Sequence, residues 1–150
     1  MNMEFSIGSY IDKDLDKKIA FEQPLSELIT QFITGVNYGE SIKTFLIGPI
    51  CVKPEVDSLF KPRRPKYTEY KEGKFDGWSP FTIEKTFVCE IKLDYEKVLE
   101  ATEEEVKKIV AQSIMDYLHE LKMPKKVTDF DKARFITDLE TFFRREHLID

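Results

Sequence analysis

The chain has few of the residues from which catalytic and metal sites are usually built. Its 150 residues include two histidines, two cysteines and one tryptophan. His119 and His147 are distant from each other and from Cys51 and Cys89, so none of them has the spacing of metal ligands. The glycine-rich phosphate loop, the nucleophile elbow and the HExxH motif are also missing. We therefore expect no catalytic residue, no cofactor and no metal, and the chain is not expected to be an enzyme.

Long apolar runs and a signal segment are missing as well. No stretch approaches the roughly 18 apolar residues of a transmembrane helix. Residues 1–9 reach a charged residue at Glu4 and lack the basic start of a secretory signal. The two cysteines, each within an apolar run, do not make a disulfide framework. These absences predict no membrane partner and a cytoplasmic location, where both thiols stay reduced and buried.

The composition is that of a globular domain. Apolar residues make up 41% of the chain and charged residues 34%, with both signs intermixed, which argues against disorder. A chain of this length fits a single domain with its own core. The formal net charge of −5 disfavours a nucleic-acid partner, because neutralising phosphates requires a basic surface. That charge suits a basic protein partner, and it would equally serve to keep a small domain in solution.

The first half of the chain carries three patterns. Residues 3–9 alternate between apolar and polar, as in a half-buried strand. Residues 11–34 have helical spacing, with Pro24 expected to kink the helix or to begin a second segment, and Gly35 suited to end it. Residues 42–52 are nearly all apolar, as in a central strand buried on both faces. Pro49 lacks an N–H, so the ladder must break there or the strand must lie at an edge.

The second half predicts a strand and then helices. Residues 81–93 alternate in strand fashion and lead into a short helical turn over 94–101. Thr102 and Glu105 form the capping box of a helix that runs to Leu121, and Thr128 or Asp129 caps a last helix to about Arg145. We therefore predict an α+β fold with a single domain over residues 1–150. It should have a largely antiparallel sheet of about four strands packed with three or four helices.

Residues 53–80 differ from the rest of the chain. They contain four of the seven prolines, and their seven basic residues outnumber five acidic ones. We expect a long, irregular, Pro-rich basic loop here, with a short hairpin near Glu72 and Gly73. Basic side chains beside aromatic ones can bind single-stranded nucleic acid, and the relevant residues are Lys61, Arg63, Arg64 and Lys66. We favour a solvated role for these four because the remainder of the chain is acidic.

Other polar residues are weaker candidates. Trp78 suits a binding anchor and a core residue about equally. Asp129, Asp131 and Glu140 have the spacing of a calcium loop, but Arg134 replaces the glycine that such a loop requires, so we reject that interpretation. Acidic side chains of the helical region, among them Glu96, Glu100 and Glu104, could face a basic partner or simply face water.

The order of elements and several motifs resemble a known family. The residues that carry the resemblance are, in chain order, Met3-Glu4-Phe5-Ser6-Ile7-Gly8-Ser9, Asn37-Tyr38-Gly39, Phe45-Leu46-Ile47-Gly48-Pro49-Ile50, Phe60-Lys61-Pro62-Arg63-Arg64, Ile91-Lys92-Leu93-Asp94-Tyr95-Glu96, and Phe130-Asp131 with Leu139 and Phe142. Together they resemble the immunity protein 44 family of bacterial polymorphic toxin systems. The resemblance spans most of the chain, except for residues 73–81.

This resemblance implies a small antitoxin that binds a cognate protein toxin tightly and blocks it. Such toxins are often nucleases with basic active faces, which the acidic chain would suit. We expect the toxin contacts at Glu96, Glu100, Glu104 and Trp78, with the chain a monomer or a weak homodimer. Two alternatives remain open. One is a small enzyme that uses Asp and Tyr residues near the middle loop, and the other is a regulatory or nucleic-acid-binding module that uses residues 61–66.

Overall fold

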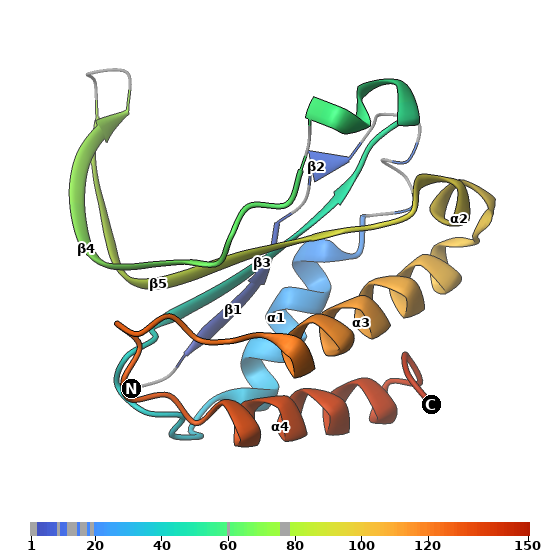
Figure 1. Cartoon of the computed structure of the whole chain (residues 1–150). Coiled ribbons are helices and arrows are strands. Elements are labelled where there is room, and N and C mark those ends of the chain that lie inside the picture. Colours follow the sequence, from blue (N-terminus) through green and yellow to red (C-terminus); the bar gives the residue numbers. More distant parts are fainter. Residues whose placement is uncertain are drawn as a thin grey trace.

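The computed structural model describes residues 3–8, 10–11, 15, 18, 20–59, 61–75 and 79–150 (Figure 1). The elements in these ranges are, in chain order, β1 (Glu4–Ile7), β2 (Tyr10–Ile11), α1 (Glu22–Ile33), β3 (Thr44–Cys51), the 3-10 helix η2 (Pro54–Leu59), β4 (Lys66–Phe75), β5 (Ser79–Lys92), α2 (Tyr95–Glu100), α3 (Glu103–Glu120) and α4 (Lys132–Arg145).

The sheet has the strand order β1-β3-β5-β4, and β2 pairs with β3 beyond the end of β1. The predicted α+β class is confirmed, but the expectation of a largely antiparallel sheet is wrong. β1, β2 and β5 all run parallel to β3, and only β4 and β5 are antiparallel. Parallel pairing requires a long crossover, and the chain between β1 and β3 supplies one because it contains α1. Strand direction is therefore set by these connections, which the local alternation of residues does not encode.

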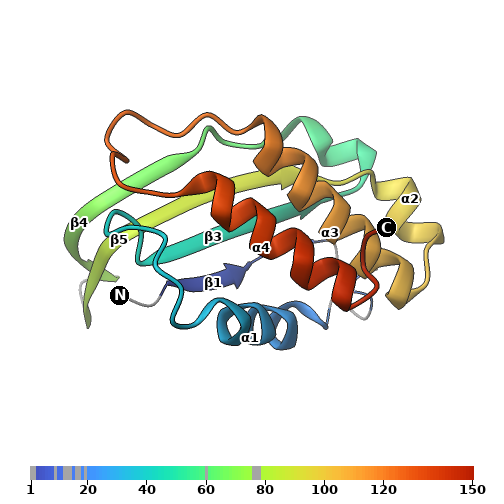
Figure 2. The same cartoon turned by 90° about the horizontal axis from the view of Figure 1, so that it is seen from below.

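The helices cover one face of the sheet and leave the other open. Figure 2 shows α1, α3 and α4 side by side across one face, while α2 lies near one end of the sheet. On the opposite face η2 rises at that same end, and the β4–β5 hairpin curves upward at the other end (Figure 1). The domain thus has a packed side and a concave, solvent-facing side.

The packed side is built around an aromatic cluster. The rings of Phe45 and Phe135 have centroids 4.9 Å apart, and those of Phe45 and Phe87 are 5.0 Å apart. Phe5 stacks on Phe45, and Tyr38 meets Phe135 edge-on. Each ring comes from a different strand, helix or loop, so the cluster joins the sheet to α4 and to the loop before β3.

Two local predictions are confirmed at the buried strand. Cys51 and Cys89 are both buried free thiols. Pro49 does break the ladder, because β3 pairs with β1 up to Ile47 and with β2 only from Ile50 onward. Ile50 accepts a hydrogen bond from Leu93 on the β5 side, so the alternating backbone turns Pro49 toward this gap. A central strand therefore tolerates proline because the missing donor lies where one neighbouring strand has ended.

The predicted helix boundaries are partly right. α1 begins at Glu22, which places Pro24 in the first turn, where its missing N–H costs nothing, and Gly35 ends the helix with a φ of 85°. The predicted helix is wrong at Ile11, which belongs to β2, and much of its remaining early part lies outside the described residues. The capping box of Thr102 and Glu105 is confirmed at the start of α3.

The last helix starts later than predicted. Asp131, rather than Thr128 or Asp129, caps α4 by accepting a hydrogen bond from the N–H of Arg134. Asp129 is engaged elsewhere, since its carboxylate accepts the N–H of Glu40. The carboxylate of Asp131, two residues later, therefore provides the hydrogen-bond acceptor at which the helix begins.

The expectation of an irregular loop at 53–80 is wrong in its middle. Residues 54–59 form η2, and residues 66–75 form β4, which pairs with β5 in a hairpin much longer than the one expected near Gly73. The connection at the tip of this hairpin, including Trp78, lies outside the described residues.

Candidate functional site

The outer half of the β4–β5 hairpin bends toward the open side of the sheet (Figure 1). Lys85 lies at this bend and has a φ of 45°, which is unusual for a residue with a side chain. Thr86 and Val88 face the open side and pair with Thr68 and Lys66, whereas beyond the bend Ile83 faces that side instead. The set of residues whose side chains face the open side therefore shifts by one position at the bend. The shift occurs in β4 and β5 alike, because Lys71 and Ile83, which pair with each other, both line the hollow.

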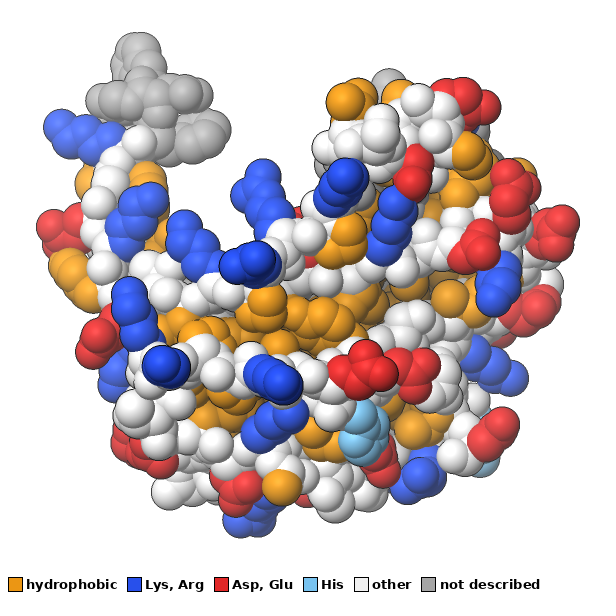
Figure 3. Space-filling view, in the orientation of Figure 1, with side chains coloured by type: hydrophobic (Ala, Val, Ile, Leu, Met, Phe, Trp, Pro, Cys, Tyr) orange, Lys and Arg blue, Asp and Glu red, His pale blue; other side chains and the backbone are white. Residues whose placement is uncertain are grey.

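This bend creates a hollow on the open face, which we call the basic hollow. It has a volume of about 290 Å³, and its lining residues are Arg63, Arg64, Lys66, Thr68, Lys71, Ile83, Thr86, Val88 and Glu90. Figure 3 shows Lys and Arg side chains gathered around the concavity between the hairpin and η2. The structure therefore brings three of the four basic residues singled out from the sequence, Arg63, Arg64 and Lys66, together with Lys71 from further along the strand.

Most of the positive charge in the basic hollow is uncompensated. Glu90 is the one acidic lining residue, and it accepts the N–H of Arg63 at 3.0 Å and pairs with its guanidinium at 3.8 Å. Arg64, Lys66 and Lys71 are exposed and form no ion pair with any described residue. These three cations therefore face solvent without a partner.

The helix η2 stands at the other end of the open face from the hairpin (Figure 1). Its Leu59 side chain is 76% exposed, which is unusual for a large apolar residue. The Lys92 ammonium and the Asp57 carboxylate meet at 2.5 Å and tie η2 to the end of β5. An ion pair therefore holds η2 at this end of the sheet.

The acidic candidates do not share one hollow: Glu96 lies beside η2, whereas Glu104 lines a separate hollow with residues of α1 and with Glu146. Asp94 caps α2, and a hollow of about 400 Å³ beside it is lined by residues of η2 and by Glu96. Glu96, Glu100 and Glu104 are all exposed, and Glu104 pairs with Lys107 at 3.0 Å within α3. Six acidic residues and one lysine occur between residues 94 and 105, and we call this stretch the acidic corner.

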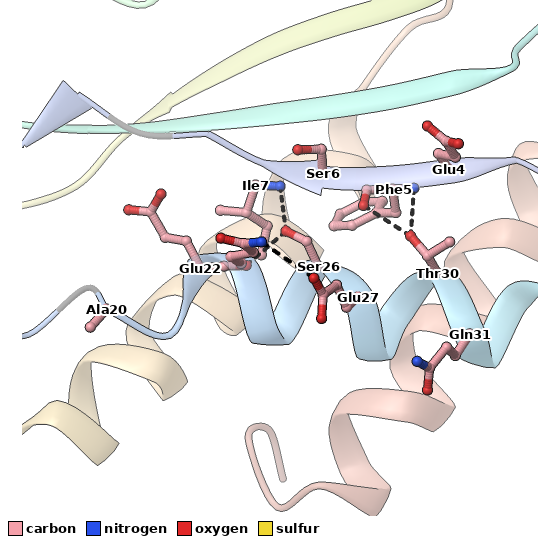
Figure 4. Close-up of a pocket in the computed structure, with 11 residues that line it drawn as sticks. Glu4, Phe5, Ser6, Ile7, Ala20, Glu22, Ser26, Glu27, Thr30 and Gln31 are labelled. Atoms are coloured by element: carbon pink, nitrogen blue, oxygen red, sulfur yellow. Dashed lines mark hydrogen bonds between the residues drawn. The ribbon is translucent and has the colours of Figure 1, made fainter.

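A separate groove of about 640 Å³ runs between α1 and β1 (Figure 4). Its hydroxyl groups are already occupied, because Ser26 accepts the N–H of Ile7 at 2.8 Å and Thr30 accepts that of Phe5 at 3.0 Å. These bonds satisfy the exposed edge of β1, which would otherwise be open to pairing with another strand. The groove is therefore the place where α1 covers the edge strand β1 and occupies its backbone N–H groups.

The buried titratable groups are poorly suited to catalysis. Burial raises the pKa of the Cys89 thiol to about 12, so it stays protonated and unreactive near neutral pH. Burial also raises the pKa of Tyr117 to about 12. His119 contacts Glu140 at 2.6 Å on the surface between α3 and α4. No group of three His, Cys, Asp or Glu residues within the described ranges could hold a metal ion.

Two sequence motifs far apart in the chain meet in a junction that holds the fold. Asp131 donates its N–H to the carbonyl of Tyr38 at 2.8 Å, and Asp129 bonds with both the N–H and the hydroxyl of Ser41. Gly39, at a φ of 105°, lies so close that an added Cβ would be 2.4 Å from the Asp129 carbonyl. The Tyr38 hydroxyl donates to Asp138 at 2.5 Å, and burial together with this bond raises its pKa. From the sequence, Asp129 is a candidate only for a helix cap or a calcium ligand, and its contacts with residues 38–41 are not predicted.

The fold and these surfaces define the class of protein. It is an α+β domain whose charged side chains, in the described residues, lie on open surfaces and not in an enclosed site. A family model described as immunity protein 44 matches residues 3–145, and the chain belongs to that family. A search of curated proteins and a search of solved structures found no match to the chain. Within the described residues, no helix combines the length and apolar character needed to cross a membrane.

Proposed function

We propose that the chain is an antitoxin of a bacterial polymorphic toxin system. It acts in the cytoplasm as a monomer or weak homodimer, where it binds the toxic domain of its cognate partner and blocks it by occlusion. The observation that carries this proposal is the match of residues 3–145 to an immunity-protein family, which implies a toxin as partner and suggests a non-enzymatic role.

Occlusion requires a surface and no turnover, and the surfaces of this domain fit that requirement. Exposed charged side chains occur on the open face and in the acidic corner, and the Ser26, Thr30 and Thr86 hydroxyls of the hollows donate to backbone carbonyls instead of side-chain bases. A rigid core beneath these surfaces would let them bind with little loss of conformational freedom. The proposal therefore needs no catalytic group from this chain.

We assign the first contact with the toxin to the acidic corner, through Glu96, Glu100 and Glu104. Their carboxylates are exposed, and an acidic surface attracts a basic one over distances of about 8–10 Å at physiological salt. A nuclease toxin presents such a basic surface, because its active face must hold phosphates. Trp78 remains our fourth proposed contact.

Growth protection tests this function directly. The toxin domain encoded beside the chain is expressed with the unchanged chain, with Glu96→Lys/Glu100→Lys/Glu104→Lys, or with the control Glu27→Lys/Asp116→Lys/Glu120→Lys. The control makes the same charge change at exposed acids of α1 and α3. We expect full protection by the unchanged chain and the control, and reduced protection by the first variant. Failure of the unchanged chain would reject the function, whereas full protection by all three would reject only the acidic contact.

A further inference from the structure

We propose that the basic hollow is a second docking surface, which receives an acidic segment of the toxin. This inference rests on the proposed function and adds the chemistry of the contact. It would place the open face of the sheet, in addition to the acidic corner, in the interface.

The shape of the hollow favours a protruding segment. The bent β4–β5 hairpin forms its wall and the strands form its floor, while η2 stands at the other end of the open face (Figures 1 and 3). Lys85 lies at the bend with a left-handed backbone, a conformation that is costly for a residue with a side chain. Such outliers concentrate at functional positions, and this one shapes the hollow.

The charges in the hollow specify an anionic occupant. Arg64, Lys66 and Lys71 have no acidic partner among the described residues, while Glu90 is already engaged by Arg63. An arginine guanidinium binds a carboxylate through two parallel hydrogen bonds, and the lysines add point charges that tolerate several geometries. Two or three Asp or Glu residues on one loop would therefore match the three free cations.

The surroundings favour an acidic protein segment over nucleic acid. Among the described side chains that line the hollow, none is an aromatic ring on which a base could stack. The chain as a whole carries a net charge of −5, and the acidic corner beyond η2 would repel an extended polyanion.

The two surfaces together give a charge pattern that a partner can recognise in one orientation only. In Figure 1, η2 stands between the curved hairpin and α2, and its Asp57 pairs with Lys92 beside the hollow that Glu96 also lines. A toxin with an acidic loop next to a basic face would complement both surfaces, whereas a rotated partner would bring like charges together. The pattern thus supplies specificity for one cognate toxin.

Charge reversal tests the inference on the complete chain. The variant is Arg64→Glu/Lys66→Glu/Lys71→Glu, and the matched control Lys108→Glu/Lys122→Glu/Lys125→Glu makes the same charge change on exposed residues that do not line the hollow. Binding to the neighbouring toxin domain is measured by calorimetry at about 50 mM and about 300 mM NaCl, since exposed ion pairs weaken with salt. Circular dichroism verifies folding, and the neutral variant Arg64→Gln/Lys66→Gln/Lys71→Gln replaces the first if it fails to fold.

We expect the variant to bind at least about 10-fold more weakly at low salt and to lose most of its salt dependence, with the control unchanged. Equal affinity of variant and unchanged chain would overturn the inference while leaving the proposed function standing. Absence of toxin binding by the unchanged chain would instead reject the proposed function.

Two other occupants are distinguished by parallel measurements. A 20-nucleotide single strand and a 20-base-pair duplex are titrated under the same conditions; tight binding that the variant loses would overturn the inference in favour of nucleic acid. Light scattering reports the oligomeric state without toxin. A dimer of the unchanged chain that the variant abolishes would assign the hollow to a second copy of the chain.

Discussion

The two faces of the central strands differ in almost every respect. On β3 and β5, Phe45, Phe87 and Cys89 point into the helix-covered core and are fully or nearly fully buried. Their neighbours Leu46, Thr86 and Val88 point to the open side and are only half-buried. The covered face is aromatic and closely packed, whereas the open face is concave, mixes apolar and polar side chains, and carries cations that have no acidic partner among the described residues. One pair of strands thus carries the fold on one side and, by our account, recognition on the other.

This difference teaches how a small binding domain can vary its specificity. Because side chains alternate along a strand, a change on the open face leaves the buried face in register. Substitutions at the basic hollow should therefore alter binding with little effect on stability. Substitutions at the neighbouring core-facing positions should lower stability with little direct effect on the binding surface.

Adjacent residues of β3 provide the strongest test of this contrast. Ile47 is 0% exposed, so Ile47→Ala should lower the free energy of unfolding by about 2–5 kcal/mol through lost burial and a cavity. Leu46→Ala removes a side chain of the same size from the open face and should cost about 1 kcal/mol or less. Urea unfolding followed by circular dichroism measures both values. Equal losses would mean that the open face belongs to the core.

The two left-handed glycines offer a smaller contrast between the junction and the surface. Gly39→Ala should lower stability by about 2–3 kcal/mol, because it adds a clash with Asp129 to the backbone strain. Gly35→Ala meets no atom within 4 Å and should cost about 1 kcal/mol from strain alone. Thermal unfolding compares the two. Similar losses of stability at both positions would show that the segment around Asp129 moves aside for the added Cβ without a measurable loss of stability.

The smallest expected effect concerns the bend at Lys85. Lys85→Gly relieves the left-handed strain but loosens the unfolded chain, so stability should change by no more than about 1 kcal/mol. Lys85→Val places a branched residue at a φ of 45° and should lower stability by about 1–2 kcal/mol. Both variants are compared by urea unfolding. A valine as well tolerated as glycine would argue that the bend is not held by this residue.

The sequence predicted well those elements whose signals are local. The alternation of residues 87–93 and the capping box of Thr102 and Glu105 both lie within a few residues, and both are confirmed. Parallel pairing was missed because strand direction depends on connections such as α1. β4 was missed because its exposed, charged sequence has no apolar period, and because the shift at Lys85 interrupts the alternation of its partner.

The candidate site was less accessible from the sequence. The cations at 63–66 were visible as a cluster, but Lys71 joins them only through strand pairing and the bend of the hairpin. The acidic corner was visible because its residues are consecutive in helical segments. The assignment of Glu96, Glu100 and Glu104 to toxin binding stays a prediction, as does that of Trp78, which lies outside the described residues.

Hydrogen exchange of the toxin complex, read by mass spectrometry, tests the central claim most directly. Our account predicts that binding slows exchange in residues 61–71 and 83–90 around the basic hollow and in residues 94–105 of the acidic corner. It predicts no change in α4, which lies on the covered face. Slowed exchange confined to α1 and α4, with the open face unaffected, would contradict the account.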